Sequence, residues 1–491
     1  MSRLASNRSW SLPGLLFAVG ATWGCSDGGP SPTDATASVD GATPSSAADG
    51  APSADVPPPI DAPSFADAAV VLGSAQTFDG TATGAPVHLL VLSDPHYYDP
   101  ALGTTGAAFE AYTARDRKLI AESDAVMRAM VAAVQTENPQ VVLISGDLTK
   151  DGEQSSHNRV AAYLRQMQAD GRKVFVVPGN HDIENDGAQS YAGDLTVPVP
   201  AISADEFSTI YRDMGYGAAM ARDSGSLSYV AEMAPGLWLL ALDSCIYGDF
   251  RAPETSSGRF TDQTKTWIQG QLALAASRGA RVLAMMHHGV VEHFANQAAI
   301  FPEYLVAERD AVAALLSNGG VGAVFTGHFH ANDITRGLPS GSARAIYDIE
   351  TGSTVTYPCP YRVVEVSSDM LIVSTKHVTA IDYDLGGAPD FQSYAHKSLR
   401  VGLEALIPEL IAQAKYAITD SEAAEVSPWL ADGLVAHYAG DEVIPLDVPA
   451  EVQTWLASGI GVELLAGMML QSIWTDLEPP DNSGILNLAT R

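Results

Sequence analysis

Hydrophobic and polar positions repeat along the chain as short apolar runs that end abruptly in polar residues. Five such runs lead into Asp, Asn or His, namely residues 87–92, 141–144, 176–177, 282–286 and 321–325. Short apolar runs bounded by polar residues predict strands that are buried on both faces, as in a sheet covered by helices. Because ligand sites in such sheets lie beyond the carboxyl ends of the strands, we expect these polar residues to converge on one rim.

Between these runs, apolar residues recur at helical spacing over residues 116–134, 155–167 and 261–276. The alternation of strand-like and helix-like segments indicates an α/β layered architecture. After residue 321 the apolar runs 343–350, 361–366 and 370–374 follow one another with only short turns. We therefore expect adjacent, antiparallel strands that complete a second sheet.

From Leu399 the pattern is helical to the end of the chain, and Pro408 is expected to bend or restart the first helix. Ser427 and Pro428 predict a cap and a first helical residue for a helix over 429–438, and 449–469 predicts another. Residues 395–491 are therefore interpreted as a small, all-helical C-terminal region. Packing against the rest of the protein is its expected role, and a cap that shapes the substrate entrance is the alternative.

The N-terminal segment has the pattern of an export signal. Arg3 and Arg8 accompany an apolar stretch, residues 12–23, that is too short to span a bilayer. Cys25, directly after Gly24, looks like the lipid-accepting cysteine of a bacterial lipoprotein. We expect residues 1–25 to be a signal peptide and the protein to be an exported outer-membrane lipoprotein, held to the membrane only by this anchor. A plain cleaved signal, which gives a periplasmic or secreted protein, and a cytoplasmic start are the alternatives.

Residues 26–80 are dominated by Ala, Ser, Pro, Asp and Gly. Such a segment buries too little apolar area to offset the entropy of ordering, so a disordered linker is predicted. Its length suits a tether between a membrane anchor and a folded domain over residues 84–385.

The composition of the chain limits the classes of molecule that it is expected to bind. The chain has 58 acidic and 27 basic residues, a net charge of −31, which argues against nucleic acid as a standing partner. The negative net charge does not argue against a small phosphorylated substrate, because a bound metal would neutralise the charge of the phosphate locally. The cysteines are too few for a disulfide scaffold or a thiolate zinc site. Cys245 and Cys359 form a bridge in an oxidising compartment or stay two separate thiols, and the oligomeric state is not predicted.

The polar residues at the run ends form a set of nitrogen and oxygen metal ligands. Asp94 and His96 are two residues apart, so in extended chain they point the same way, and His328 and His330 repeat that spacing. The candidate metal ligands are Asp94, His96, Asp147, Asn180, His287, His328 and His330. The mixture suits Mn, Fe or Zn better than an all-oxygen Ca or Mg site. Two such ions sharing Asp147 could generate hydroxide and hold the attacking and leaving oxygens. His181 could stabilise the transferring phosphoryl group and protonate the leaving alkoxide.

The order Asp-x-His, Gly-Asp, Gly-Asn-His-Asp, His-His, Gly-His-x-His is similar to that of the calcineurin-like metallophosphoesterase superfamily. The resemblance implies a four-layer αββα sandwich. It also implies two groups of ligands that share Asp147: Asp94, His96, Asp147 and His330 for one ion, and Asp147, Asn180, His287 and His328 for the other. By the same resemblance His181 is the catalytic histidine, Asp182 is the residue that orients it, and His287 rather than its neighbour His288 is a ligand.

Lys150 stands where purple acid phosphatases have a tyrosine ligand, so the pattern is closer to class III cyclic nucleotide phosphodiesterases. The resemblance thus implies a dinuclear-metal phosphoesterase that hydrolyses a phosphodiester, with a 3′,5′-cyclic nucleotide as one candidate, by attack of metal-bound hydroxide. The alternatives are a phosphomonoesterase or nucleotidase-type metallophosphatase, and a non-catalytic surface protein that uses the same scaffold for binding.

Overall fold

The computed structural model describes residues 86–247, 256–413, 419–440, 442–443, 453–455 and 461–489. The expected signal peptide, Cys25 and the expected linker over 26–80 lie outside the described residues. Within these ranges, no helix combines the length and the apolarity that crossing a membrane requires.

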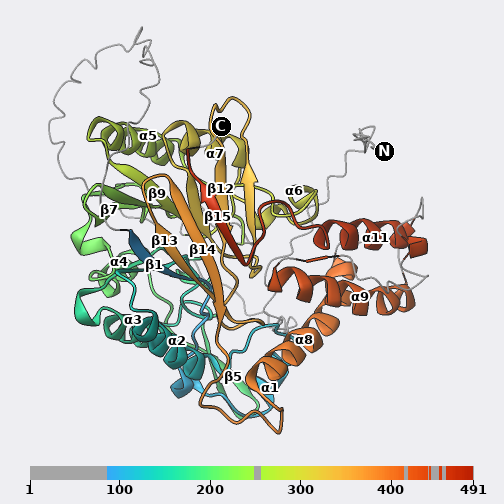
Figure 1. Cartoon of the computed structure of the whole chain (residues 1–491). Coiled ribbons are helices and arrows are strands. Elements are labelled where there is room, and N and C mark those ends of the chain that lie inside the picture. The colour runs from blue at the N-terminus through green and yellow to red at the C-terminus, as the bar shows by residue number, and fades with distance from the viewer. Residues whose placement is uncertain are drawn as a thin grey trace, which may run out of the picture. The chain divides into compact units, whose positions relative to one another are not determined.

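The first sheet has six strands in the order β15-β14-β13-β1-β2-β3 (Figure 1). Its parallel half comprises β1 (Val87–Leu92), β2 (Val141–Ile144) and β3 (Lys173–Val176). Its antiparallel half comprises β13 (Pro360–Val366), β14 (Met370–His377) and β15 (Ser483–Asn487). The apolar runs at 87–92 and 141–144 are therefore strands with the predicted bounds.

The second sheet has seven strands in the order β11-β12-β10-β9-β8-β7-β6. The middle of this sheet is parallel and comprises β8 (Leu237–Ala241), β9 (Arg281–Met285), β10 (Ala323–Thr326) and β12 (Ile346–Glu350). The antiparallel strands at its two edges are β11 (Ile334–Gly337), β7 (Tyr229–Ala234) and β6 (Ala221–Arg222). A separate hairpin is formed by β4 (Gln189–Ala192) and β5 (Leu195–Pro198).

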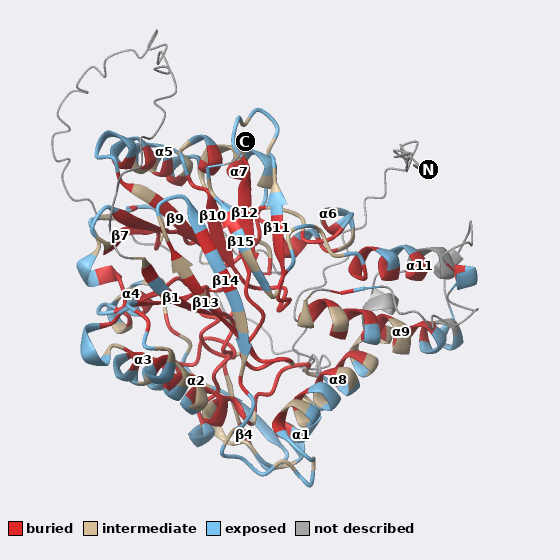
Figure 2. Ribbon diagram, viewed as in Figure 1, coloured by how far each residue is buried: buried red, intermediate tan, exposed pale blue. Residues whose placement is uncertain are grey.

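The two sheets pack face to face, and alternate residues of one strand show it. In β9, Leu283 and Met285 join the core between the sheets, whereas Val282 and Ala284 join a second core under helices. The helices of that second core are α5 (Asp262–Ser277) and α7 (Arg309–Asn318). The first sheet is covered by α2 (Ser123–Glu137) and α3 (Gln154–Met167), and buried strands lie between helices with exposed outer faces (Figure 2). The predicted αββα sandwich is confirmed.

Helix boundaries follow local hydrogen bonds. Thr261 caps α5, since its side chain accepts a hydrogen bond from the Thr264 N–H. The helix expected from residue 116 begins only at Ser123, because the Asp116 carboxylate accepts a hydrogen bond from the Lys118 N–H at 2.9 Å and so forms a competing turn. Shorter α-helices within the described residues are α1 (Ala107–Thr113), α4 (Ala204–Ile210) and α6 (Gln297–Ile300).

The C-terminal region is helical in α8 (Phe391–Gln413), α9 (Asp420–Ala439) and α11 (Gly461–Ile473). Pro408 lies inside α8. Pro428 lies inside α9, so Ser427 is not the predicted helix cap; its hydroxyl donates to the Ala423 carbonyl at 2.6 Å instead. The region is also not helical to its end. Close to its end, Ser483–Asn487 form β15, which pairs with β14 and covers the hydrogen-bonding edge that β14 would otherwise expose.

The two cysteines within the described ranges are free thiols. Cys359 is buried, and burial raises the pKa of its thiol. The Cys245 thiol contacts the Pro178 carbonyl oxygen at 3.3 Å. Of the two sequence alternatives, the structure shows two separate thiols.

Candidate metal centre

The carboxyl ends of β1, β2, β3, β9 and β10 meet at one rim, where all seven candidate ligands are buried. Most of these residues leave their strand through a left-handed turn. Positive φ angles of 35° to 77° occur at Asp94, His96, Asp147, His328 and His330. Such angles are uncommon for residues other than glycine and concentrate at functional sites, where the surrounding fold holds them. These turns aim the side chains inward over the sheet edge.

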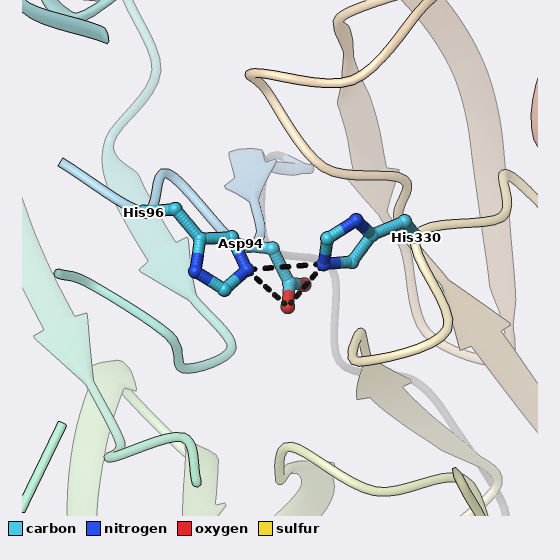
Figure 3. Close-up of side chains that lie close together, drawn as sticks. All are labelled: Asp94, His96 and His330. Atoms are coloured by element: carbon cyan, nitrogen blue, oxygen red, sulfur yellow. Dashed lines mark hydrogen bonds and ion pairs between the residues drawn. The ribbon is translucent and has the colours of Figure 1, made fainter. Parts of the chain in front are cut away.

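Asp94, His96 and His330 form one group, which is drawn in Figure 3. The Nε2 atoms of His96 and His330 lie 3.0 Å apart. Asp94 Oδ1 lies 3.8 Å from the first nitrogen and 3.5 Å from the second. The three ligand atoms therefore converge on one point, although the two histidines are 234 residues apart in sequence.

Asp147, His287 and His328 form the other group. His287 Nε2 lies 3.4 Å from Asp147 Oδ2 and 3.0 Å from Asn180 Oδ1. The ring of His328 lies 4.6 Å from that of His287, and its Nε2 is buried without a hydrogen bond. Asp147 Oδ2 is also 3.5 Å from His96 Nε2, so one carboxylate oxygen reaches both groups.

The protonation states of these histidines fit metal binding. Burial lowers the pKa of His96 and of His328 well below the usual value, and it lowers the pKa of His330 to about 4. These three imidazoles are therefore neutral near pH 7, which is the form that ligates a metal. Burial also acts against the charged form of His287, but Asp147 raises its pKa to about 9. The position of the His287 ring beside Asp147 therefore favours a positive charge. A metal cation bound there would supply that charge in place of the proton. The donor set fits divalent ions such as Mn, Fe or Zn.

A second layer of contacts holds these side chains in place. The His287 Nδ1 lies 2.8 Å from the Ser145 carbonyl oxygen, and the His330 Nδ1 lies 3.2 Å from Thr356 Oγ1. Asp94 accepts hydrogen bonds from the Ser93 hydroxyl and, at 3.1 Å, from the His328 N–H. Partners of this kind fix the orientation of metal ligands.

His181 lies next to both groups. Its ring centre is 4.9 Å from that of His96, and its main-chain N–H donates to Asp147 Oδ1 at 2.9 Å. Its Nδ1 lies 2.8 Å from Asp151 Oδ1. Burial disfavours a charged carboxylate at Asp151, but Lys150 and His181 hold its pKa below the usual range. Asp151 is thus an anionic partner that the motif comparison missed, and the only sequence signal for it is an acidic residue shortly after Asp147.

Asp182, which the resemblance implies to be the residue that orients His181, makes its hydrogen bonds mainly to the main chain. Its carboxylate accepts hydrogen bonds from the main-chain N–H groups of Gly179 at 2.8 Å and of Leu148 and Thr149, both at 3.0 Å. It therefore ties the turn after β3 to the turn after β2. We propose that Asp151, whose Oδ1 lies 2.8 Å from His181 Nδ1, orients the His181 ring.

His288 does not share the role of His287. Its Nδ1 lies 2.7 Å from Ser244 Oγ and its Nε2 lies 2.8 Å from the Ser256 carbonyl oxygen. Both ring nitrogens are therefore engaged in the protein interior, and His287 is the member of the pair that reaches the site.

Residues 87–332 match the family model described as calcineurin-like phosphoesterase. A comparison with curated proteins found no match. Among solved structures, the chain is similar to a dimetal phosphatase from Danio rerio, with 18% identity and a TM-score of 0.44 over 60% of this chain and 97% of that one. It is also similar to the protein TT1561 of Thermus thermophilus, with 12% identity and a TM-score of 0.34 over 60% of this chain and 100% of that one.

Proposed function

Because the chain belongs to the calcineurin-like phosphoesterase family and is a metal-dependent phosphoric ester hydrolase, we propose that it hydrolyses a small phosphodiester, with a 3′,5′-cyclic nucleotide as the first candidate. The observation that carries this proposal is the position of Asp147, whose Oδ2 lies within 3.5 Å of an imidazole nitrogen from each ligand group. A carboxylate in that position is suited to bridge two cations. The preference for a diester is supported by the motif pattern, including Lys150 in place of a tyrosine ligand.

In this proposal each group holds one ion, and the groups are Asp94, His96, Asp147 and His330, and Asp147, Asn180, His287 and His328. When bound, two divalent ions supply Lewis-acid stabilisation of the phosphoryl oxygens and a nucleophile derived from water. The chain provides rigid donors for them, because every proposed ligand is buried.

The protein's own contribution to proton transfer centres on His181. Asp151 contacts Nδ1, and in this proposal Nε2 is the nitrogen that exchanges a proton with the leaving oxygen of the substrate. The hydrogen bond from the main-chain N–H of His181 to Asp147 Oδ1 ties the backbone that carries this imidazole to the proposed bridging carboxylate. A proton donor held in this way contributes about 10² to 10⁴ in rate.

The test uses the full chain, stripped of metal and reloaded separately with Mn²⁺, Fe²⁺ or Zn²⁺. Turnover is measured on bis-p-nitrophenyl phosphate, p-nitrophenyl phosphate and a set of cyclic nucleotides. We expect diesters to be preferred, the stripped protein to be inactive, and His181→Asn to lose about 10²-fold or more in kcat at unchanged metal content. His396→Asn, which changes an exposed histidine of α8, is the matched control.

A preference for p-nitrophenyl phosphate would instead establish the phosphomonoesterase alternative. If the metal-loaded protein hydrolyses neither class of ester, the result would support the alternative that the scaffold serves only for binding.

We further propose that the protein is exported and anchored through a lipid on Cys25. The support is the order of basic start, short apolar segment and Gly24-Cys25 in the sequence. Radiolabelled palmitate should label the wild type and not Cys25→Ser, and the variant should leave the membrane fraction. Labelling that persists in Cys25→Ser would contradict the proposal.

A further inference from the structure

Outside the catalytic centre, three buried metal-ligating side chains come together from separate parts of the chain. Ligand atoms of Asp333, His437 and Glu442 all lie within 4.8 Å of one another. Asp333 directly precedes β11, His437 lies in the last turn of α9, and Glu442 follows that helix. We propose that these residues bind a third divalent cation, which fastens the C-terminal region to the second sheet.

The unused carboxylate oxygens are the first support. Asp333 Oδ1 faces His293 Nδ1 at 2.7 Å and accepts from Thr335 Oγ1 at 2.9 Å, while Asp333 Oδ2 is buried without a hydrogen bond. Glu442 repeats this division, since His437 Nδ1 lies 2.6 Å from Oε1 and Oε2 is buried without a hydrogen bond. Buried carboxylate oxygens are nearly always hydrogen-bonded or coordinated. Two such oxygens beside one imidazole form a donor set for a cation.

The charged groups around the cluster do not provide hydrogen bonds to the unused oxygens, Asp333 Oδ2 and Glu442 Oε2. The ring nitrogens of His293 lie 2.7 Å from Asp333 Oδ1 and 3.5 Å from both Asp348 Oδ2 and Glu350 Oε2. This one imidazole is therefore shared among three carboxyl groups. Arg362 also lies on that side and donates to the main-chain carbonyl of Asp333 at 3.1 Å. The remaining oxygen of Asp333 faces His437 Nδ1 at 3.9 Å, on the side of Glu442.

Neighbouring side chains hold two of the proposed ligands, Asp333 and His437, in place. His293 holds Asp333 as a hydrogen-bonded histidine does for a metal-ligating carboxylate. The His437 ring packs edge-on against the rings of Phe294 at 5.1 Å and Phe329 at 5.5 Å. One imidazole and two carboxylates favour Zn²⁺ or Mn²⁺ over Ca²⁺. Binding through Nδ1 would use the neutral imidazole of His437 with its proton on Nε2, and coordination would replace the contact between Nδ1 and Glu442 Oε1.

An ion here would act on the catalytic centre only through position. Phe329 stands between His328 and His330 in sequence, and its ring contacts those of His437 and Tyr438, the latter at 5.9 Å. Joining His437 and Glu442 to Asp333 would therefore hold α9 behind the loop that carries two proposed catalytic ligands. The inference does not depend on the proposed substrate or on turnover.

The experiment counts metal ions in the full chain. Protein loaded with Zn²⁺ or Mn²⁺ and dialysed is analysed by inductively coupled plasma mass spectrometry. We expect three ions per chain in the wild type and two in Glu442→Gln and in His437→Gln. Glu425→Gln removes an exposed carboxylate of the same helix and should keep three. The melting temperature should fall on chelation by more in the wild type than in Glu442→Gln.

Cobalt titration of the wild type gives a reading that needs no variant. A third equivalent of Co²⁺ that changes the visible spectrum supports the site, and saturation at two equivalents overturns it. Equal metal content in the wild type and in folded Glu442→Gln and His437→Gln also overturns it, whatever the esterase activity. An inert protein that still binds three ions would count against the proposed function and leave this site standing.

Discussion

At the scale of single residues, two buried aspartates act differently around His181. Asp151 contacts the His181 ring at 2.8 Å, whereas Asp182 accepts hydrogen bonds from three main-chain N–H groups of the neighbouring turns. The first is therefore placed to orient an imidazole. The second sets the conformation of the backbone that carries it.

Exchange of each aspartate for asparagine should separate these roles. Asp151→Asn should lower kcat by about 10- to 100-fold at unchanged metal content, because the His181 ring loses the carboxylate that contacts its Nδ1. Asp182→Asn should lower the free energy of unfolding by about 1–3 kcal/mol, because buried N–H groups lose an acceptor. Kinetics and urea unfolding of both variants check this. Equal losses of kcat, with stability unchanged in both, would contradict the division.

His157 provides a pH-dependent contribution to stability. Its ring nitrogens lie 2.8 Å from the Tyr211 hydroxyl and 2.9 Å from the Asp182 carbonyl oxygen, and burial lowers its pKa to about 3. The unfolded chain binds a proton near pH 6.5 and the folded protein does not until about pH 3. The contribution is therefore present above pH 6.5 and is lost as the pH falls from there towards 3.

His157→Gln should be less stable than the wild type at pH 7.5, and the difference should shrink by up to about 1.4 kcal/mol per pH unit below pH 6.5. Urea unfolding at several pH values measures both. His396→Gln, at an exposed position, controls for removal of a histidine. A difference that stays constant from pH 7.5 to 4.5 would show that His157 is not held neutral.

At the scale of elements, the turns that follow the strands depend on close backbone approach. A Cβ at Gly179 would meet the Asp147 main-chain nitrogen and carboxylate, and a Cβ at Gly327 would meet Ser93 Oγ and Asp94 Oδ2. These glycines let two strand ends come close enough for their ligands to converge. Motif spacing alone shows the glycines but not what lies against them.

Gly327→Ala should therefore bind less metal at the catalytic centre and lose most of its activity, because Asp94 must move. Gly270→Ala is the control: it lies on an exposed turn of α5 with nothing within 4 Å of the added Cβ. It should raise the free energy of unfolding by up to about 1 kcal/mol through helix propensity. Metal content and thermal unfolding distinguish the two, and full metal content in Gly327→Ala would refute the packing argument.

At the scale of the whole molecule, the C-terminal region is part of the fold. Its helices bury Leu399, Leu430 and Leu470 in one cluster with Phe294 and Phe329 of the phosphoesterase domain. Its last strand completes the first sheet, and Leu486 of β15 is fully buried. This supports packing as the role of the region, and the same contacts place α9 behind the His328–His330 loop.

A chain that ends at residue 388 should consequently lose solubility and melt at a lower temperature, because it exposes this apolar cluster and the edge of β14. Expression level, size-exclusion chromatography and thermal unfolding measure the effect. A chain that begins at residue 81 lacks only the expected signal and linker and should keep the wild-type melting temperature. A soluble shortened chain with wild-type stability would make the C-terminal region a dispensable addition.

The amino-acid sequence by itself determined the elements whose signals are local. The apolar runs at 87–92 and 141–144 became strands with those bounds, and Thr261 became the cap of α5. Local signals failed where another contact was stronger. The Asp116 turn delayed α2, and packing carried α9 through Pro428. Residues 483–487 became a strand because β14 offered them an edge.

For the site, motif order was enough to name the seven candidate ligands, because each follows a strand and strand ends share a rim. Only the tertiary structure placed Asp151 against His181, and only it brought Asp333 to His437 and Glu442 across about a hundred residues of chain. Periodicity and motif spacing report which backbone conformations neighbours in sequence prefer. Contacts between distant residues depend on how whole layers pack, and no short stretch of sequence contains that information.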